Sequence, residues 1–139
     1  MLKVQDVMTP GVTAINIGST VAQAGARMKR ENIGWLPILR DGEIVGVISD
    51  RDIVTRAIAA GRDPANTPVS DVLSESPVTC RAQHGVKQAA LLMQSSKVRR
   101  LLVVDEKNEP VGVLSVGDLA ASVPDRAIAG KTMAEVCRH

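Results

Sequence analysis

One motif with the residue types of a binding site occurs twice in the sequence. Each copy is a short apolar run that ends in a serine, with an aspartate three residues later. The first copy holds Ser49 and Asp52, and the second holds Ser115 and Asp118. A hydroxyl and a carboxylate at this spacing suit either the start of a helix or a ligand with hydroxyl and anionic groups.

Two interpretations of the motif stay open. In the structural one, the serine and the aspartate each accept a backbone N–H of the helix start, as in a capping box. In the functional one, the serine and the helix start face an anion, and the aspartate accepts hydrogen bonds from the adjacent hydroxyls of a ribose.

The motif is part of a repeat that covers most of the chain. Residues 4–8 recur as 69–73, residues 21–24 as 86–89, and residues 45–49 as 111–115, at an offset of 65 or 66. Such regularity indicates two copies of one structural unit. We predict repeats at residues 1–61 and 69–123, a linker at 62–68 and a helical tail at 124–139.

Each repeat reads as β-α-β-β-α, which predicts an α+β fold. A repeat of about 60 residues buries little surface alone, so we expect the two to pack sheet to sheet about a pseudo-two-fold axis.

Local signals predict the elements of the first repeat. Apolar residues at helical spacing follow Ser19 and Thr20, either of which can cap the helix, and Asp41-Gly42 is a hairpin signal. The first repeat is expected to have strands at 12–15, 36–39 and 44–48, and helices at 21–31 and 50–60. In the tail, Ala127, Ile128, Met133 and Val136 suggest a short amphipathic helix.

Composition excludes several function classes. The chain has one Trp, no Phe and no Tyr, and a net charge of +2, which argues against nucleic-acid binding because base stacking needs aromatic side chains. No apolar run reaches the roughly 18 residues of a membrane helix, and the N-terminus lacks a signal-peptide pattern. We therefore expect a cytoplasmic protein without a membrane partner.

Catalytic and metal-binding residues are not expected. Cys80 and Cys137 have no metal or redox spacing, and Cys80 is predicted to be buried in a strand. His84 and His139 lie far apart, and no nucleophile–base set or P-loop occurs. We predict no enzyme activity, no metal and no catalytic cofactor.

The doubled pattern apolar-Gly-apolar-apolar-Ser-x-x-Asp closely resembles the signature of the CBS domain pair, or Bateman module. Agreement extends to residues 6–9, 33–38 and 98–101, and covers nearly all of residues 4–122. The resemblance implies a non-catalytic regulatory sensor of an adenine nucleotide. Members of the family bind AMP, ATP, NAD-type cofactors or S-adenosylmethionine, and some have no known ligand.

The resemblance also implies two clefts between the repeats. One ribose would bind at Ser49 and Asp52 and the other at Ser115 and Asp118, with adenine against the first strands. Leu102 stands where the first repeat has Pro37, which alters the second cleft. The predicted nucleotide-binding residues are Thr13, Ile15, Pro37, Ile38, Ser49, Arg51, Asp52, Thr79, Arg99, Arg100, Ser115 and Asp118.

The phosphates require positive charge, and Arg99 and Arg100 supply it at the start of a strand of the second repeat. A solvated surface pair is the alternative interpretation. The first repeat has Gly34 and Trp35 at these positions, so the two sites are expected to be unequal. We expect the first cleft to bind phosphate better, with Arg51 nearby and Arg99 or Arg100 reaching across.

Two functions remain in competition. The first is a sensor that binds AMP, ADP, ATP or NAD(H) and reports to an unidentified regulated protein. The second is a homodimeric structural or interaction module whose clefts bind no nucleotide. A homodimer is expected in both cases.

Overall fold

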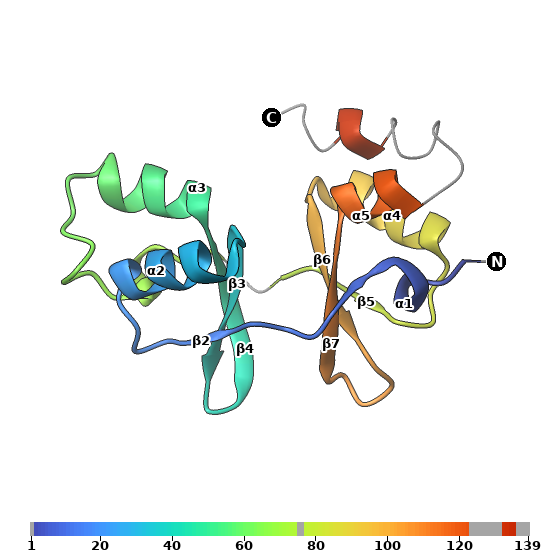
Figure 1. Cartoon of the computed structure of the whole chain (residues 1–139), viewed down its shortest axis with the longest axis horizontal. Coiled ribbons are helices and arrows are strands. Elements are labelled where there is room, and N and C mark those ends of the chain that lie inside the picture. Colours follow the sequence, from blue (N-terminus) through green and yellow to red (C-terminus); the bar gives the residue numbers. More distant parts are fainter. Residues whose placement is uncertain (1, 75–76, 123–131, 136–139) are drawn as a thin grey trace. The chain divides into compact units, whose positions relative to one another are not determined.

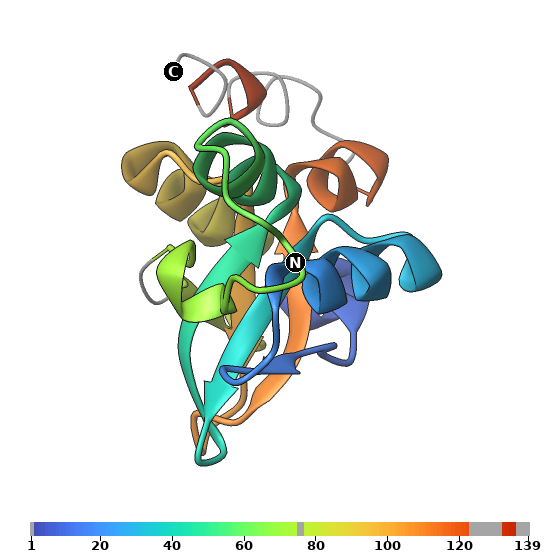
Figure 2. The same cartoon turned by 90° about the vertical axis from the view of Figure 1, so that its left-hand side faces the viewer.

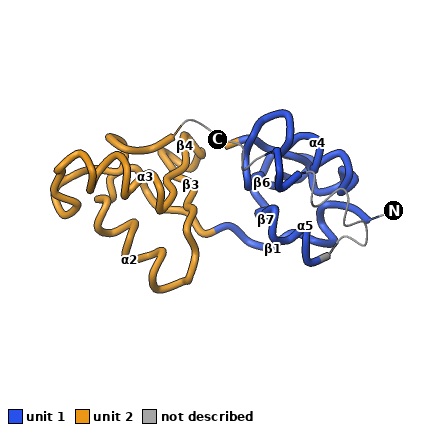
Figure 3. The backbone as a smooth tube through the Cα atoms, turned by 90° about the horizontal axis from the view of Figure 1, so that it is seen from above, with its two compact units in different colours: residues 1–12, 78–139 blue, residues 13–77 orange. Residues whose placement is uncertain are grey.

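The computed structural model describes residues 2–74, 77–122 and 132–135. The chain divides into two compact units (Figure 3). Unit 1 consists of Met1–Val12 and Val78–His139, and unit 2 of Thr13–Pro77. Both repeats have the order β-α-β-β-α, so the predicted α+β class and the tandem repeats are confirmed. The packing of sheet on sheet remains a prediction.

Unit 2 is built on a three-stranded sheet in the order β2-β3-β4. Strand β2 runs parallel to β3, and β3 runs antiparallel to β4. The helices lie on one face of this sheet (Figures 1 and 2). The elements are β2 (Ile15–Asn16), α2 (Val21–Glu31), β3 (Trp35–Arg40), β4 (Glu43–Ser49), α3 (Asp50–Asp52), the π-helix η1 (Ile53–Ile58) and the 3-10 helix η2 (Val69–Asp71).

Local sequence signals explain the boundaries of α2 and of the hairpin. Thr20 and Gln23 form a reciprocal capping box, which starts the helix at the predicted residue. The helix ends at Asn32, whose left-handed φ of 54° closes the last turn. A two-residue hairpin turn is predicted at Asp41 and Gly42, and their φ values of 50° and 81° fit a turn of type I′.

Two elements of this repeat differ from the prediction. The first strand begins at Ile15, because only Ile15 and Asn16 pair with β3. The hydroxyl of Thr13 instead donates a hydrogen bond to Glu31. The second helix is α-helical only for its first turn and continues as a π-helix, in which Ala59 N–H reaches five residues back to Val54.

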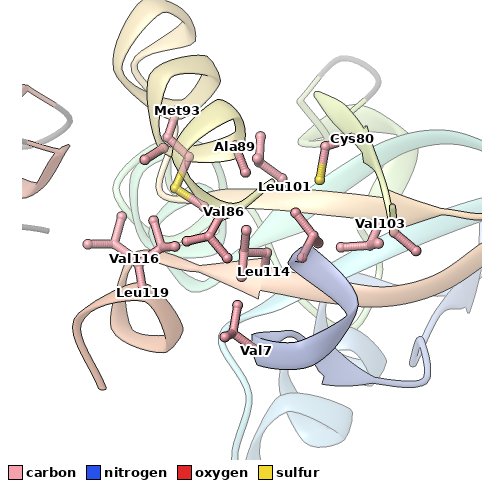
Figure 4. Packing of buried hydrophobic residues seen from close by; sticks show 13 residues of the cluster. Val7, Cys80, Val86, Ala89, Met93, Leu101, Val103, Leu114, Val116 and Leu119 are labelled. Atoms are coloured by element: carbon pink, nitrogen blue, oxygen red, sulfur yellow. The ribbon is translucent and has the colours of Figure 1, made fainter. Parts of the chain in front are cut away.

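Unit 1 contains a four-stranded sheet in the order β1-β7-β6-β5, with its helices on one face (Figure 1). Apolar side chains of helices α1, α4 and α5 meet those of β6 and β7 in one core (Figure 4). Among them, Met93, Leu101 and Leu114 are fully buried. The elements are α1 (Val4–Val7), β1 (Thr9–Pro10), β5 (Thr79–Arg81), α4 (Val86–Ser96), β6 (Arg100–Val104), β7 (Pro110–Ser115) and α5 (Val116–Ser122).

The compact units do not follow the sequence repeats at their first segments. Val4 and Val7, from the start of repeat 1, are buried in the core of unit 1. Val69 and Val72, from the start of repeat 2, are buried in the core of unit 2. Each unit therefore completes its core with the opening segment of the other repeat.

In each unit, a glycine without a side chain leaves room for the backbone of this opening segment. In unit 1, β1 pairs with β7, and a Cβ on Gly112 would lie 2.7 Å from the carbonyl oxygen of Thr9. In unit 2, Ser74 bridges to Val47, and a Cβ on Gly46 would lie 2.6 Å from the carbonyl oxygen of Ser74. Both glycines are needed because the crossing backbone occupies the space of a side chain.

The described part of the tail touches unit 1. Thr132 to Glu135 are helical, and the buried Thr132 hydroxyl accepts a hydrogen bond from the Gln94 side chain at 2.9 Å. Met133, predicted on the apolar side of a tail helix, is 42% exposed, whereas Ala127, Ile128 and Val136 lie outside the described residues. Among the described residues, no helix has the length and apolar character to cross a bilayer.

Cys80 lies in β5 and is 3% exposed, which confirms its prediction as a buried strand residue. Burial raises the pKa of its thiol from 9.0 to about 11. In the variant Cys137→Ser, where Cys80 is the only cysteine, we expect Ellman's reagent at pH 8 to react about a hundredfold more slowly than in urea-unfolded chain, since the thiolate is the reactive form. Equal rates in folded and unfolded protein would contradict the buried thiol.

Candidate functional site

Both Ser-x-x-Asp motifs lie where a strand passes directly into a helix. Ser49 ends β4 before α3, and Ser115 ends β7 before α5. In each motif the aspartate N–H donates to the serine hydroxyl oxygen, at 3.1 Å for Asp52 and 3.0 Å for Asp118. The serine N–H donates back to the carboxylate, at 2.9 and 3.0 Å. The capping interpretation is therefore confirmed for both motifs, and a binding role requires acceptor capacity beyond the cap.

Asp52 has less of this acceptor capacity than Asp118. The hydroxyl of Ser74 lies 3.3 Å from each of its two carboxylate oxygens. The Nε of Arg56 lies 3.9 Å from Oδ1, and Nη1 of the same side chain donates to the carbonyl oxygen of Leu73 at 3.0 Å. Asp52 is 9% exposed. Both of its oxygens already face donors from unit 2.

Asp118 differs from Asp52 in this respect. Its Oδ2 accepts the N–H of Ser115, while Oδ1 has no hydrogen bond or ion pair within the described part of the chain. The residue corresponding to Ser74 is Thr9, whose backbone pairs with β7. Arg56 corresponds in sequence to Ser122, which carries no charge. The carboxylate of Asp118, which is half-buried, therefore has one oxygen without a partner in the part of the chain that the structure describes.

Arg99 and Arg100 lie at the same end of the sheet as Ser115. Arg100 is the register partner of Ser115 across β6 and β7, and the carbonyl oxygen of Arg99 accepts the N–H of Val116 at 2.9 Å. Within residues 2–74, 77–122 and 132–135, neither guanidinium has a carboxylate within ion-pair distance. Among its described residues, unit 1 thus has two arginines without an acidic partner at the end of the sheet that carries the Ser115–Asp118 motif.

The matching end of unit 2 carries no cation at these positions. Trp35 is the register partner of Ser49, and Gly34 accepts the N–H of Asp50. A Cβ on Gly34 would lie 2.7 Å from Oδ2 of Asp50, so a side chain there would collide with that carboxylate. A larger residue at Gly34 would therefore require the Asp50 side chain to shift.

The first strands differ between the units as well. Thr79 begins β5, is exposed and pairs with Leu102 of β6. Thr13 is engaged with Glu31, and the Arg27 hydrogen bond, with help from Thr13, lowers the pKa of that carboxyl. The hydroxyl of Thr79 has no corresponding partner among the described residues.

The remaining predicted residues lie in unit 2. Ile15 and Ile38 are 7% and 0% exposed and belong to its hydrophobic core. Pro37 is buried in β3 opposite Val47, and Arg51 is exposed on α3. The structure therefore groups Thr79, Arg99, Arg100, Ser115 and Asp118 in unit 1, and Thr13, Ile15, Pro37, Ile38, Ser49, Arg51 and Asp52 in unit 2.

Sequence reasoning missed Ser74 and Arg56. Aligning the repeats pairs Arg56 with Ser122 and Ser74 with Thr9, which shows that these positions differ between the repeats. It does not show their contacts with Asp52, because neither residue belongs to the Ser-x-x-Asp motif and both approach Asp52 only through the fold.

Unit 1 also has a cavity of about 610 Å³ beside α4. Cys80, His84, Gln88, Leu91 and Glu135 are among its lining residues. None of the predicted nucleotide-binding residues lines it. No group of three or more His, Cys, Asp or Glu side chains that fits a metal ion occurs among the described residues.

A family model described as CBS domain matches the chain twice, over residues 4–58 and 69–125. The CBS domain-containing protein YhcV of Bacillus subtilis (strain 168) is 35% identical over 136 residues, which are 98% of this chain and 96% of YhcV. Hypoxic response protein 1 of Mycobacterium tuberculosis is 32% identical over 129 residues, 92% of this chain and 90% of that protein.

Two solved structures are similar to this chain over most of its length. Hypoxic Response Protein I with two coordinated zinc ions has a TM-score of 0.75 and 30% identity, covering 88% of this chain and 100% of that one. CBSX2 in complex with AMP has a TM-score of 0.71 and 26% identity, covering 88% of this chain and 96% of that one.

Proposed function

The chain belongs to the CBS domain family, and from that premise we propose that it is a non-catalytic regulatory module that binds an adenine nucleotide in unit 1. One observation carries the proposal. Among the residues that the structure describes, Oδ1 of Asp118 has no partner, and the guanidinium groups of Arg99 and Arg100 at the same end of the sheet have no acidic one.

These groups match the two polar ends of a nucleotide. A carboxylate oxygen accepts the hydroxyl hydrogens of a ribose, and a guanidinium pairs with phosphate oxygens in a fork geometry. The hydroxyls of Thr79 and Ser115 stand at the same end of the sheet and add donors and acceptors. In contrast to the sequence-based expectation, we assign the better phosphate site to the second motif.

AMP is the first ligand to test, because CBSX2 is similar over most of the chain and was solved with AMP. ADP, ATP and NAD(H) present the same ribose and phosphate groups. Titration calorimetry with each, and with adenosine as the phosphate-free control, tests the proposal. We expect AMP to bind about tenfold more tightly than adenosine, because hydrogen bonds to charged groups are the stronger ones. Absence of heat and of a thermal shift with all of them at millimolar concentration would refute the proposal.

A structural or interaction module is the second candidate. The specific observation in its favour is that capping alone accounts for the hydrogen bonds of Ser49 and Ser115. If that module is the function, Asp118→Asn changes stability at most and no nucleotide binds. The two candidates therefore differ in a direct binding measurement.

We further propose that the module is a cytoplasmic homodimer that reports to a regulated protein. Exposed apolar side chains in each unit support self-association: Val54 and Ile58 of η1 in unit 2 are 57% and 54% exposed, and Leu91 of α4 in unit 1 is 55% exposed. Equilibrium sedimentation tests the dimer, and a monomer at micromolar concentration would exclude it.

A further inference from the structure

We infer that the Ser49–Asp52 site of unit 2 is closed by a latch, Ser74 and Arg56 of the same unit, so that each chain binds one nucleotide and not two. The inference rests on the proposed function of the Ser115–Asp118 site. In this inference, Ser74 and Arg56 limit the number of nucleotides that one chain binds.

The latch occupies the groups that a ribose would use. The Ser74 hydroxyl lies 3.3 Å from both Oδ1 and Oδ2 of Asp52, where the two hydroxyls of a ribose would donate. A ligand entering this site must displace the hydroxyl, so the loss of the Ser74 hydrogen bond offsets part of what the ribose hydroxyls gain.

Arg56 adds a charge to the closure. Its Nε lies 3.9 Å from Oδ1 of Asp52, and its Nη1 donates to Leu73, one residue before Ser74. The guanidinium therefore holds the carboxylate and the backbone of the crossing segment at once. The Arg56 side chain is 52% exposed and that of Asp52 is 13% exposed, so solvent screens this pair in part and the pair adds to the Ser74 contact without replacing it.

The crossing segment itself is fixed by backbone pairing. Val47 and Ser74 exchange hydrogen bonds at 3.2 and 2.8 Å, and Gly46 leaves room for that approach. The Ser74 hydroxyl is thereby held over Asp52 by the strand pairing.

Unit 1 repeats this architecture without the latch. Thr9 replaces Ser74 in the crossing segment and makes no hydrogen bond to Asp118 within the described residues. The position of Arg56 is taken by Ser122 in the sequence. The two ends also differ in phosphate contacts, since Arg99 and Arg100 correspond to Gly34 and Trp35.

The test opens the latch by Arg56→Ser combined with Ser74→Ala and counts AMP molecules per chain by equilibrium dialysis. We expect one AMP per wild-type chain and two per chain of the opened variant, the second more weakly bound because Gly34 and Trp35 supply no cation. Adding Asp52→Asn to the opened variant should return the count to one.

The outcomes separate the inference from the proposed function. Two AMP molecules on the wild-type chain, or one on the opened variant at saturating AMP, would overturn the latch. No AMP on the wild type but one on the opened variant, lost with Asp52→Asn, would support the latch and refute the unit 1 site. No AMP on either protein would refute both.

A measurement on the wild type decides the question if the opened variant does not fold. In amide NMR spectra we expect AMP to shift the signals of Ser115 and Asp118 and to leave those of Ser49 and Asp52 in place. Saturable shifts of comparable size at both motifs would overturn the latch.

Discussion

Asp118→Asn is expected to weaken AMP binding about 10- to 150-fold. The substitution removes the charge from the one motif aspartate whose Oδ1 remains available, and a hydrogen bond to a charged group contributes about 1.5–3 kcal/mol. The asparagine side-chain oxygen still accepts the N–H of Ser115, so the helix cap persists. Calorimetric titration of AMP into both proteins measures the effect, with thermal unfolding as the check on stability.

Asp52→Asn is the matched comparison for this prediction. Asp52 has the same cap but is already engaged by Ser74 and Arg56, so its loss of charge should lower stability and change AMP affinity by less than about threefold. Equal losses of affinity in the two variants would contradict the assignment of the site to unit 1.

Gly112→Ala is expected to destabilise the protein by about 1–3 kcal/mol, the usual cost of forcing an extra group into a packed position. The new Cβ would lie 2.6 Å from Sδ of Met8 and 2.7 Å from the carbonyl oxygen of Thr9. Relief requires β1 to move away from β7, because the Thr9 oxygen belongs to backbone. Urea unfolding measures the change in the free energy of unfolding.

Gly25→Ala controls for the general effect of adding a methyl group. Gly25 lies inside α2 with nothing within 4 Å of its added Cβ, so alanine should stabilise the helix by about 0.5–1 kcal/mol. If Gly112→Ala is as stable as the wild type, the close crossing of β1 over β7 is wrong.

Local sequence signals predicted the elements whose ends have specific chemistry. The start of α2 follows from the Thr20 and Gln23 capping box, and the β3–β4 turn follows from Asp41-Gly42. The doubled Ser-x-x-Asp motif also placed both junctions of strand and helix correctly. These signals act over a few residues, so a sequence displays them directly.

The exchange of opening segments was not predictable in the same way. Val4 and Val7 have the pattern of a short apolar helix turn that fits the core of either repeat, and Val69 and Val72 have the same pattern. The choice depends on long-range packing at Gly46 and Gly112, which the one-dimensional pattern does not encode.

The sequence predicts that the two sites are unequal, and it favours the Ser49–Asp52 site for phosphate. The structure-based proposal favours the Ser115–Asp118 site instead. Repeat alignment shows that Arg99 and Arg100 have no counterparts. It does not show that Ser74, 22 residues from Asp52 in sequence, donates to that carboxylate. A contact between a loop and a helix start depends on the crossing backbone, which only the fold defines.

A crystal structure of the chain with AMP tests the central claim most directly. We predict ribose hydroxyls within about 3.2 Å of the Asp118 carboxylate and the phosphate on Arg99 or Arg100. AMP bound at Asp52 with Ser74 displaced, or in the cavity beside α4, would contradict it.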